Sequence, residues 1–348
     1  MRLVCLLALS VRLVLDVAYG AYVGKGTGER ALLRQILGRV MRQGLLVLLD
    51  AGLYAFEVIW AIADQKQEFL VKVPRTVKLK RLKTLPDGSY LALLPGKIED
   101  PEPSTSEKGR TRWKKVSLMV RVIDYTIPGF RPVRLMTNIL DPNITARELV
   151  LHYHKRWDIE IAYDEIKTHQ CVTLRGQSPT TFRSKRPDLV EQELYAMVIM
   201  YNLVRQLIAQ AAASHGKDPR LISFSDALQH LLEAAPLMTA LEPDQRAVEF
   251  EDLLAVIADC DIDRSRRARI NPRVVKVKMS KFKRKGPTDK SEDRDLAKAL
   301  EIIGPTSDTS PELIIKPKPP APIQDLLTLI IIATLAGATA SILFETRT

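Results

Sequence analysis

Short apolar runs alternate with amphipathic stretches along the first 75 residues. Val- and Leu-rich runs bounded by turn residues are typical of strands, and leucines at intervals of three and four predict helices. The expected elements are strands at 3–9, 11–18, 45–49 and 69–73 and helices at 29–42 and 57–64. This succession predicts a mixed α/β sheet.

The pattern changes after residue 75. Basic and apolar residues alternate, Asp87-Gly88 is a hairpin signal, and the runs at 114–127 and 131–140 predict strands. This region is therefore expected to be a mostly β insertion. Helical periodicity then dominates, and the clearest helices are expected at 145–169, 188–214 and 223–234.

The two apolar ends of the chain each allow more than one interpretation. Residues 2–19 resemble a signal peptide, but Arg12 and Asp16 interrupt them, which favours two strands. Near the other end, 326–344 carries no charge over 19 residues and follows a proline-rich run. It predicts a membrane anchor, a buried helix or a tail foreign to the main domain, and the sequence leaves these three open.

Charge points to a class of partner. Lys and Arg number 52 against 41 Asp and Glu, a net charge of +11, and 264–285 alone holds eleven basic residues and no acidic one. Such a stretch predicts a polyanionic partner, DNA or RNA before a membrane surface, or else a solvated basic tail. Three scattered cysteines without a C-x-x-C pair argue against a disulfide framework and favour a reducing compartment.

The stretch 145–169 carries the strongest candidate chemistry. Thr145 and Glu148 form a capping-box pattern that marks its start. At about 100° per residue, one stripe roughly 60° wide contains four side chains: Tyr153, Arg156, Glu160 and Lys167. The stripe predicts either an ordinary exposed face with ion pairs, or a carboxylate that binds a metal beside cations that bind phosphate. The neighbouring Trp157 is expected in the core.

Asp50 is the candidate second carboxylate. It ends a fully apolar strand and precedes a glycine turn, where α/β folds expose functional groups at the edge of a sheet. Carboxylate oxygens suit Mg²⁺, which usually keeps few protein ligands and adds substrate phosphates. The alternative is that Asp50 caps a turn or a helix, and its position alone does not decide between the two.

Residues 153–167 resemble the Tyr-Arg-Glu-Lys signature of the insertion-sequence-four family of DDE transposases. The signature residues lie in the run YHKRWDIEIAYDEIK, preceded by LMTNILD at 135–141 and, farther upstream, by DAG at 50–52. Two later segments, YAMVIMYNLVR at 195–205 and NPRVVKVKMSKFKRK at 271–285, are also similar to that family. The likeness covers roughly 1–286.

The resemblance implies a ribonuclease-H-like core with a β insertion before the last acidic residue. Asp50 would be the second and Glu160 the third carboxylate of a site for Mg²⁺ (or Mn²⁺) that performs two-metal phosphoryl transfer. The partner would be double-stranded DNA, at the transposon ends and at the target. The protein would act in the cytoplasm, at the nucleoid, and the resemblance is compatible with a homodimer on DNA. The expected DNA-binding residues are Tyr153, Arg156, Lys167, Trp113 as a stacking candidate, Arg273, Lys276 and Lys278.

The expected organisation follows these segments. It consists of a first part of the core at 1–75, the β insertion at 76–140, a second part of the core at 141–210, a helical extension at 211–262, a basic segment at 263–289 and a proline-rich linker with apolar tail at 290–348.

One departure from the family pattern concerns the first acidic residue. Only two strands are expected before the helix at 29–42, so we expect the strand that would carry the first Asp to be missing from an N-terminally truncated copy. Asp16 is a poor substitute because it sits on what reads as a later strand. We therefore expect a weakly active or inactive transposase. The alternatives are a non-catalytic DNA-binding remnant and a protein anchored in a membrane by 326–344.

Overall fold

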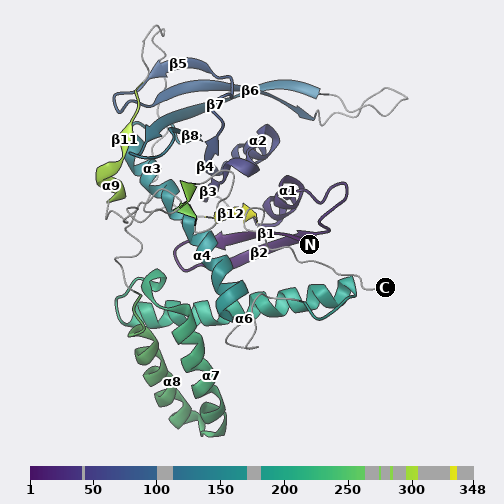
Figure 1. Cartoon of the computed structure of the whole chain (residues 1–348), viewed down its shortest axis with the longest axis vertical. Coiled ribbons are helices and arrows are strands. Elements are labelled where there is room, and N and C mark those ends of the chain that lie inside the picture. The colour runs from purple at the N-terminus through teal and green to yellow at the C-terminus, as the bar shows by residue number, and fades with distance from the viewer. Residues whose placement is uncertain are drawn as a thin grey trace. The chain divides into compact units, whose positions relative to one another are not determined.

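The computed structural model describes residues 1–40, 44–99, 113–170, 182–262, 274–275, 283–284, 295–304 and 330–334. The chain forms two compact units (Figure 1). Unit 1 comprises Met1–Met41, Lys155–Asp263 and Thr328–Thr348, and unit 2 comprises Arg42–His154 and Arg264–Leu327.

Unit 1 contains a small sheet and most of the helices. Its strands are β1 (Arg2–Ala8), β2 (Leu13–Gly20) and β12 (Ile330–Thr334), and its helices are α1 (Glu29–Val40), α4 (Asp158–Asp164), α6 (Pro187–Ser214), α7 (Phe224–Ala240) and α8 (Pro243–Ala258). Shorter turns of 3-10 helix lie at Lys155–Trp157 and Pro219–Leu221, and a π-helical turn lies at Glu165–His169. The strand order is β2-β1-β12, with both pairings antiparallel.

Unit 2 contains the longer sheet, in the order β3-β4-β8-β7-β6-β5. The strands of unit 2 are β3 (Leu46–Leu49), β4 (Glu68–Val73), β5 (Lys80–Thr84), β6 (Tyr90–Glu99), β7 (Trp113–Thr126), β8 (Val133–Thr137), β9 (Val274–Val275), β10 (Lys283–Arg284) and β11 (Glu301–Ile302). Its helices are α2 (Phe56–Asp64), α3 (Ala146–His154) and α9 (Leu296–Ala299), with a 3-10 turn at Ala51–Leu53. β3 and β4 run parallel. The pairs β4–β8, β8–β7, β7–β6 and β6–β5 are antiparallel, so the sheet is mixed as the sequence predicts.

The apolar pattern of the sequence corresponds to the buried core. All four residues of β3 are fully buried, as are Phe69, Leu70 and Val71 in β4, which is the pattern of strands covered on both faces. The Asp87-Gly88 signal is confirmed as the turn between β5 and β6, where Gly88 adopts φ +83°, a conformation that favours glycine.

The apolar stretch at 326–344 is described only in part. Ile330–Thr334 is a strand that pairs antiparallel with β1, from Val4 opposite Thr334 to Ala8 opposite Ile330. That portion is therefore not the buried helix that the sequence allowed. Among the described residues, no helix combines the length and the apolar character needed to cross a bilayer.

Gly96 in β6 is required by the packing of α2. A Cβ built on Gly96 would lie 2.2 Å from two atoms of the Phe56 ring, which itself stacks on Trp60 with a centroid separation of 5.9 Å. We expect Gly96→Ala to lower the free energy of unfolding by about 1–3 kcal/mol, because the ring must be displaced from its site. Urea denaturation would measure this.

Gly38 offers the matched control for this substitution. It lies at an exposed position of α1, and no atom beyond its two chain neighbours and the nearby backbone of the helix lies within 4 Å of the place that an added methyl group would take. Gly38→Ala is therefore expected to stabilise the chain slightly, since alanine favours the helix. Equal losses from both substitutions would contradict the role assigned to Gly96.

Candidate active site

Asp50 lies directly after β3, at the carboxyl end of a strand whose residues are all buried. Its Oδ1 accepts a hydrogen bond of 2.7 Å from the backbone N–H of Ala51 and so begins the 3-10 turn at Ala51–Leu53. The side chain is half-buried. Asp50 is thus the turn residue that the sequence allowed, at the strand end where a functional carboxylate would also be expected.

Tyr153 is fixed inside unit 2. It lies in α3 and is 5% exposed, and its hydroxyl donates to the carbonyl of Leu49 at 3.1 Å. Leu49 immediately precedes Asp50, so this bond attaches α3 to the end of β3. The capping box that begins α3 is confirmed, because the Thr145 N–H donates to Glu148 Oε2 at 2.8 Å and the Glu148 N–H donates to Thr145 Oγ at 3.2 Å.

The stretch expected as one α-helix at 145–169 consists of four segments. α3 is followed by the 3-10 turn Lys155–Trp157, then by α4, then by the π-helical turn Glu165–His169. A uniform rotation of 100° per residue therefore does not apply along it, since the 3-10 and π turns wind more tightly and more loosely. Such π turns inside helices are frequent at functional sites.

The remaining signature residues lie in unit 1. Glu160 is exposed, whereas Arg156 and Lys167 are half-buried. The Lys167 ammonium lies 5.8 Å from the centroid of the Tyr163 ring, and burial lowers the pKa of Lys167. Because Asp50 and Tyr153 belong to unit 2, the convergence of Asp50 and Glu160 stays a prediction.

Two tryptophans considered in the sequence analysis are exposed. Trp157 was expected in the core, and this expectation is wrong: it lies in the 3-10 turn with 56% of its surface exposed. Trp113 begins β7 and is 54% exposed beside the exposed Lys114 and Lys115. An exposed indole beside cations is what a base-stacking role would need.

Three expected DNA-binding residues, Arg273, Lys276 and Lys278, lie outside the described residues. Within that basic stretch the structure describes only the two short strands β9 and β10, which pair in parallel. Over the described part of the chain, no three His, Cys, Asp or Glu side chains are grouped so that they could hold a metal ion.

A buried ionic cluster in unit 1 was not expected from the sequence. Arg12, which in the sequence only interrupts an apolar run, is fully buried and bonds to Asp158 and Glu165. Tyr201 and Arg205 of α6 reach the same Glu165 carboxylate. The one available signal is the pair of acidic residues seven positions apart, Asp158 and Glu165, with the apolar Ile161 and Ala162 at the helical spacings between them.

Similarity to known proteins agrees with this geometry. Residues 1–203 match the sequence model of the family described as transposase DDE domain. The chain is also 27% identical, over 287 residues, to the transposase InsG for insertion sequence element IS4 of Escherichia coli (strain K12). That alignment covers 81% of this chain and 60% of the relative, so the chain spans less than two thirds of the relative's length.

The family model covers more than half of the chain, and the signature residues lie in one helical stretch that follows, in the sequence, the strand directly before Asp50. The mixed α/β sheet agrees with the ribonuclease-H-like fold of such domains. The chain therefore belongs to the DDE transposases of the IS4 family.

Proposed function

We propose that the chain binds the DNA ends of an insertion sequence and acts on them by metal-dependent phosphoryl transfer. The observation that carries this proposal is the Tyr-Arg-Glu-Lys signature in a chain of this family, with Glu160 exposed on α4. Asp50, at the end of β3, is the second proposed carboxylate. Pairing of two copies on DNA stays a prediction.

The donor chemistry of these two side chains fits Mg²⁺ or Mn²⁺. Both side chains end in carboxylate oxygens, and Mg²⁺ needs few protein ligands when phosphate oxygens complete its shell. When bound, the ions would activate water or a 3′-hydroxyl and stabilise the leaving oxygen. Asp50 and Glu160 would hold them.

Arg156 and Lys167 are the proposed phosphate ligands of the signature. An arginine presents a planar fork of donors to phosphate, whereas a lysine acts as a point charge. Burial lowers the pKa of Lys167 and so disfavours its charged form. A neighbouring phosphate would act in the opposite direction and favour the charged ammonium. We also expect Tyr153 to fix the end of β3, because its hydroxyl is bonded to Leu49; a DNA contact by Tyr153 stays a prediction.

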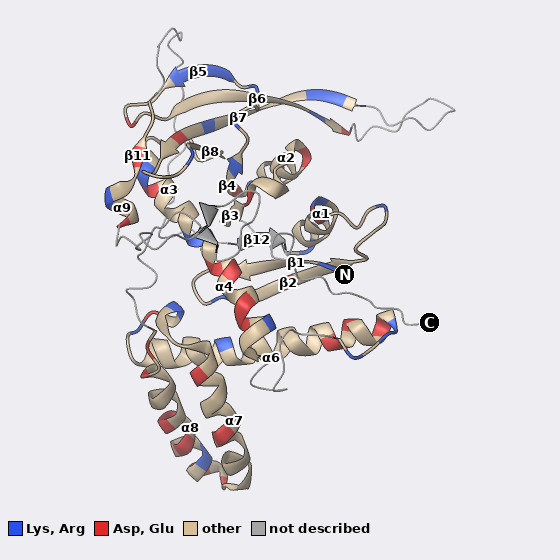
Figure 2. Ribbon diagram, viewed as in Figure 1, with Lys and Arg blue, Asp and Glu red and all other residues tan. Residues whose placement is uncertain are grey.

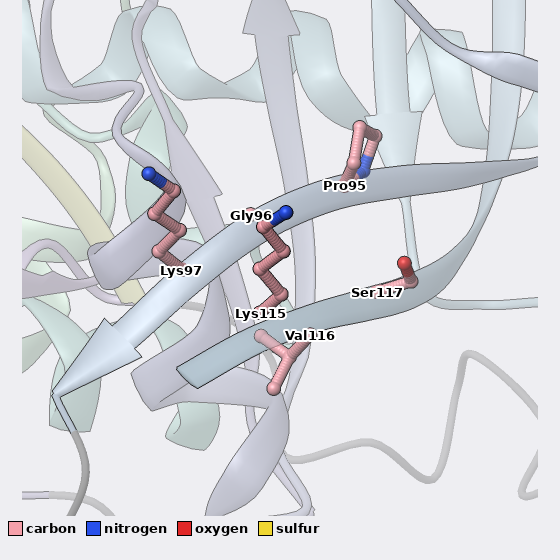
Figure 3. A pocket seen from close by; sticks show the side chains of 6 residues that line it. All are labelled: Pro95, Gly96, Lys97, Lys115, Val116 and Ser117. Atoms are coloured by element: carbon pink, nitrogen blue, oxygen red, sulfur yellow. The ribbon is translucent and has the colours of Figure 1, made fainter. Parts of the chain in front are cut away.

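The β6–β7 hairpin carries a basic surface that fits the DNA backbone. Figure 2 shows Lys and Arg at the β7 end of this hairpin and along β5. Lys97 and Lys115 lie directly opposite each other in the strand register and line a shallow hollow with Pro95, Gly96, Val116 and Ser117 (Figure 3). Like charges opposite each other destabilise a strand pair, so an anionic partner would relieve this repulsion.

We expect Lys97→Ala/Lys115→Ala to weaken binding of a DNA duplex and to leave folding intact. Each lost phosphate contact should reduce the slope of log Kd against log salt concentration by about 0.9, so the slope should fall by about two. Fluorescence anisotropy across a salt series would measure it. Lys25→Ala/Lys298→Ala removes the same charge from exposed sites elsewhere and should change the slope less.

A second candidate function is DNA binding without strand cleavage. Asp16 is the one acidic residue in β1 and β2, and both of its oxygens are bonded to Arg39, at 2.8 and 3.1 Å. A carboxylate held in this way is a poor third metal ligand. This observation favours weak activity or none.

A nicking assay separates the two candidates. A labelled duplex that carries the terminal repeat of the element encoding this chain is incubated with the protein and Mg²⁺ or Mn²⁺. Metal-dependent nicking that Asp50→Asn and Glu160→Gln both abolish supports the transposase activity, with Glu251→Gln, exposed on α8, as the control. Binding without nicking supports the second candidate, and a chain that does neither contradicts both.

A further inference from the structure

A buried ionic cluster lies beneath the helical stretch that carries Glu160. Arg12, in the turn between β1 and β2, is 0% exposed and adopts φ +57°, a left-handed conformation that costs a non-glycine residue about 1 kcal/mol or more. Its Nη2 donates to Asp158 Oδ1 at 2.8 Å and its Nη1 to Glu165 Oε1 at 3.1 Å. One guanidinium therefore bridges the first residue of α4 and the first residue of the π-helical turn.

Two side chains of α6 also bond to Glu165. The Tyr201 hydroxyl and Arg205 Nε both donate to Glu165 Oε2 at 3.1 Å, and Arg205 Nη2 donates to Oε1. Both side chains are fully buried. Burial by itself lowers the pKa of Arg205, but the combined attraction of Glu165 and Tyr201 raises it above its ordinary value.

The β1–β2 hairpin is tied to α6 by a further pair of hydrogen bonds. The Val14 N–H donates to Asn202 Oδ1 at 2.9 Å, and Asn202 Nδ2 donates to the Val14 carbonyl at 2.8 Å. The segment YNLVR at 201–205, which resembles the family without a stated role, thus contributes three side chains that hold Glu165 and the strand after Arg12.

The cluster balances its charges but is costly to build. Arg12 and Arg205 face Asp158 and Glu165, so two cations meet two anions, and Arg220 pairs with Asp218 at 2.7 Å at the edge. Buried ion pairs add little net stability, because desolvation offsets their attraction, whereas they can select one geometry. The geometry selected here is that of the segment Asp158–His169.

The cluster and Glu160 lie on different sides of that segment. Glu160 follows Asp158 by two residues within α4, about 200° around an α-helix. Asp158 and Glu165 both bond to the buried Arg12 and so face the same side. The cluster can therefore hold the buried side of the helix and leave the exposed side, with Glu160, for a ligand.

We propose that Arg12, Tyr201 and Arg205 form a clamp on Asp158 and Glu165 that positions Glu160 and Lys167. These three are positioning residues, since they act through the helix. The proposal rests on the proposed function in its assignment of Glu160 to a metal ion.

Two conservative variants of the full chain test the clamp. Arg12→Lys keeps the charge but loses the fork that bridges two carboxylates, and Tyr201→Phe removes one donor to Glu165. Arg39→Lys is the matched control, because it removes a similar fork from the half-exposed pair with Asp16. Hydrogen exchange of peptides covering 158–169 and 224–240 reports local order, and electron paramagnetic resonance of free Mn²⁺ reports metal affinity.

We expect both clamp variants to accelerate exchange in 158–169 by about tenfold, with 224–240 unchanged, and to weaken the Mn²⁺ binding that Glu160→Gln abolishes. The control should change neither. Unchanged exchange in 158–169, equal acceleration in both peptides, or faster exchange with unchanged Mn²⁺ affinity would each overturn the clamp. If the wild-type chain binds no Mn²⁺ through Glu160, the proposed function fails instead, and the exchange data still decide whether the clamp orders the helix.

Discussion

Glu165→Leu is expected to destabilise unit 1 by about 3–5 kcal/mol, because it leaves buried cations without their anion. Glu165 accepts hydrogen bonds from Arg12, Tyr201 and Arg205, and both arginines are fully buried. Leucine fills a similar volume, so the loss would come from charge and hydrogen bonding. Urea denaturation followed by circular dichroism would measure it.

The control for this substitution is Glu251→Leu, at an exposed position of α8. We expect it to change the free energy of unfolding by less than about 0.5 kcal/mol. The double variant Glu165→Leu/Arg205→Met should lose less unfolding free energy than the two single variants lose together, since it removes one of the unpaired buried cations along with the anion. A loss below about 1 kcal/mol for Glu165→Leu would show that the cluster is not needed for folding.

Arg121→Met is expected to lower the free energy of unfolding of unit 2 by a similar amount, about 3–5 kcal/mol. Arg121 is fully buried, and its guanidinium donates to four acceptors: Asp87, Ser89 Oγ at 2.9 Å, and the carbonyls of Asp141 and Ile144 at 2.8 and 2.7 Å. Asp87 in turn accepts from the Ala146 N–H at 2.6 Å, at the first residue of α3. The substitution would therefore loosen the loop before α3 as well as the sheet.

The pH dependence of unfolding gives this second prediction a distinct signature. Burial alone would raise the pKa of Asp87, but hydrogen bonds from Ser89 and Ala146 and the charge of Arg121 bring it below the ordinary value of 3.8. A carboxyl with a lowered folded-state pKa stabilises the fold above its unfolded pKa and loses that contribution as pH falls through the folded pKa. The difference in stability between wild type and Arg121→Met should thus shrink below about pH 4.

A difference that stays constant from pH 7 to pH 3 would contradict the part assigned to Asp87. Arg134→Met offers a comparison, because Arg134 pairs with Asp124 at 2.8 Å on the same sheet but keeps more contact with solvent. Arg134→Met should therefore lower the free energy of unfolding less than Arg121→Met does.

Local patterns predict most of the elements correctly. The leucine spacing at 29–42 predicts α1 (Glu29–Val40), and the apolar run at 45–49 predicts β3 (Leu46–Leu49). The capping box at Thr145 is confirmed, because its two hydrogen bonds form within four residues. The expected domain boundaries stay predictions.

Two errors have different physical causes, one a local change of helix type and the other a set of contacts between distant segments. The sequence predicts Trp157 in the core, yet it lies in a 3-10 turn and is exposed. In the sequence Arg12 only interrupts an apolar run, because its partners lie 146 and 153 residues away in the chain. No local pattern predicts which buried carboxylate will face such an arginine.

The sequence by itself determined the family, the mixed α/β sheet and the candidate carboxylates Asp50 and Glu160, since each of these depends on motifs and on hydrophobic periodicity that a short window contains. Only the tertiary structure decided that Tyr153 bonds to the strand end before Asp50 and that Asp158 and Glu165 lie in a buried cluster with Arg12, Tyr201 and Arg205. The reason is that a buried charge is tolerable only where several distant side chains meet it together, and that meeting is a property of the packed chain rather than of any one segment.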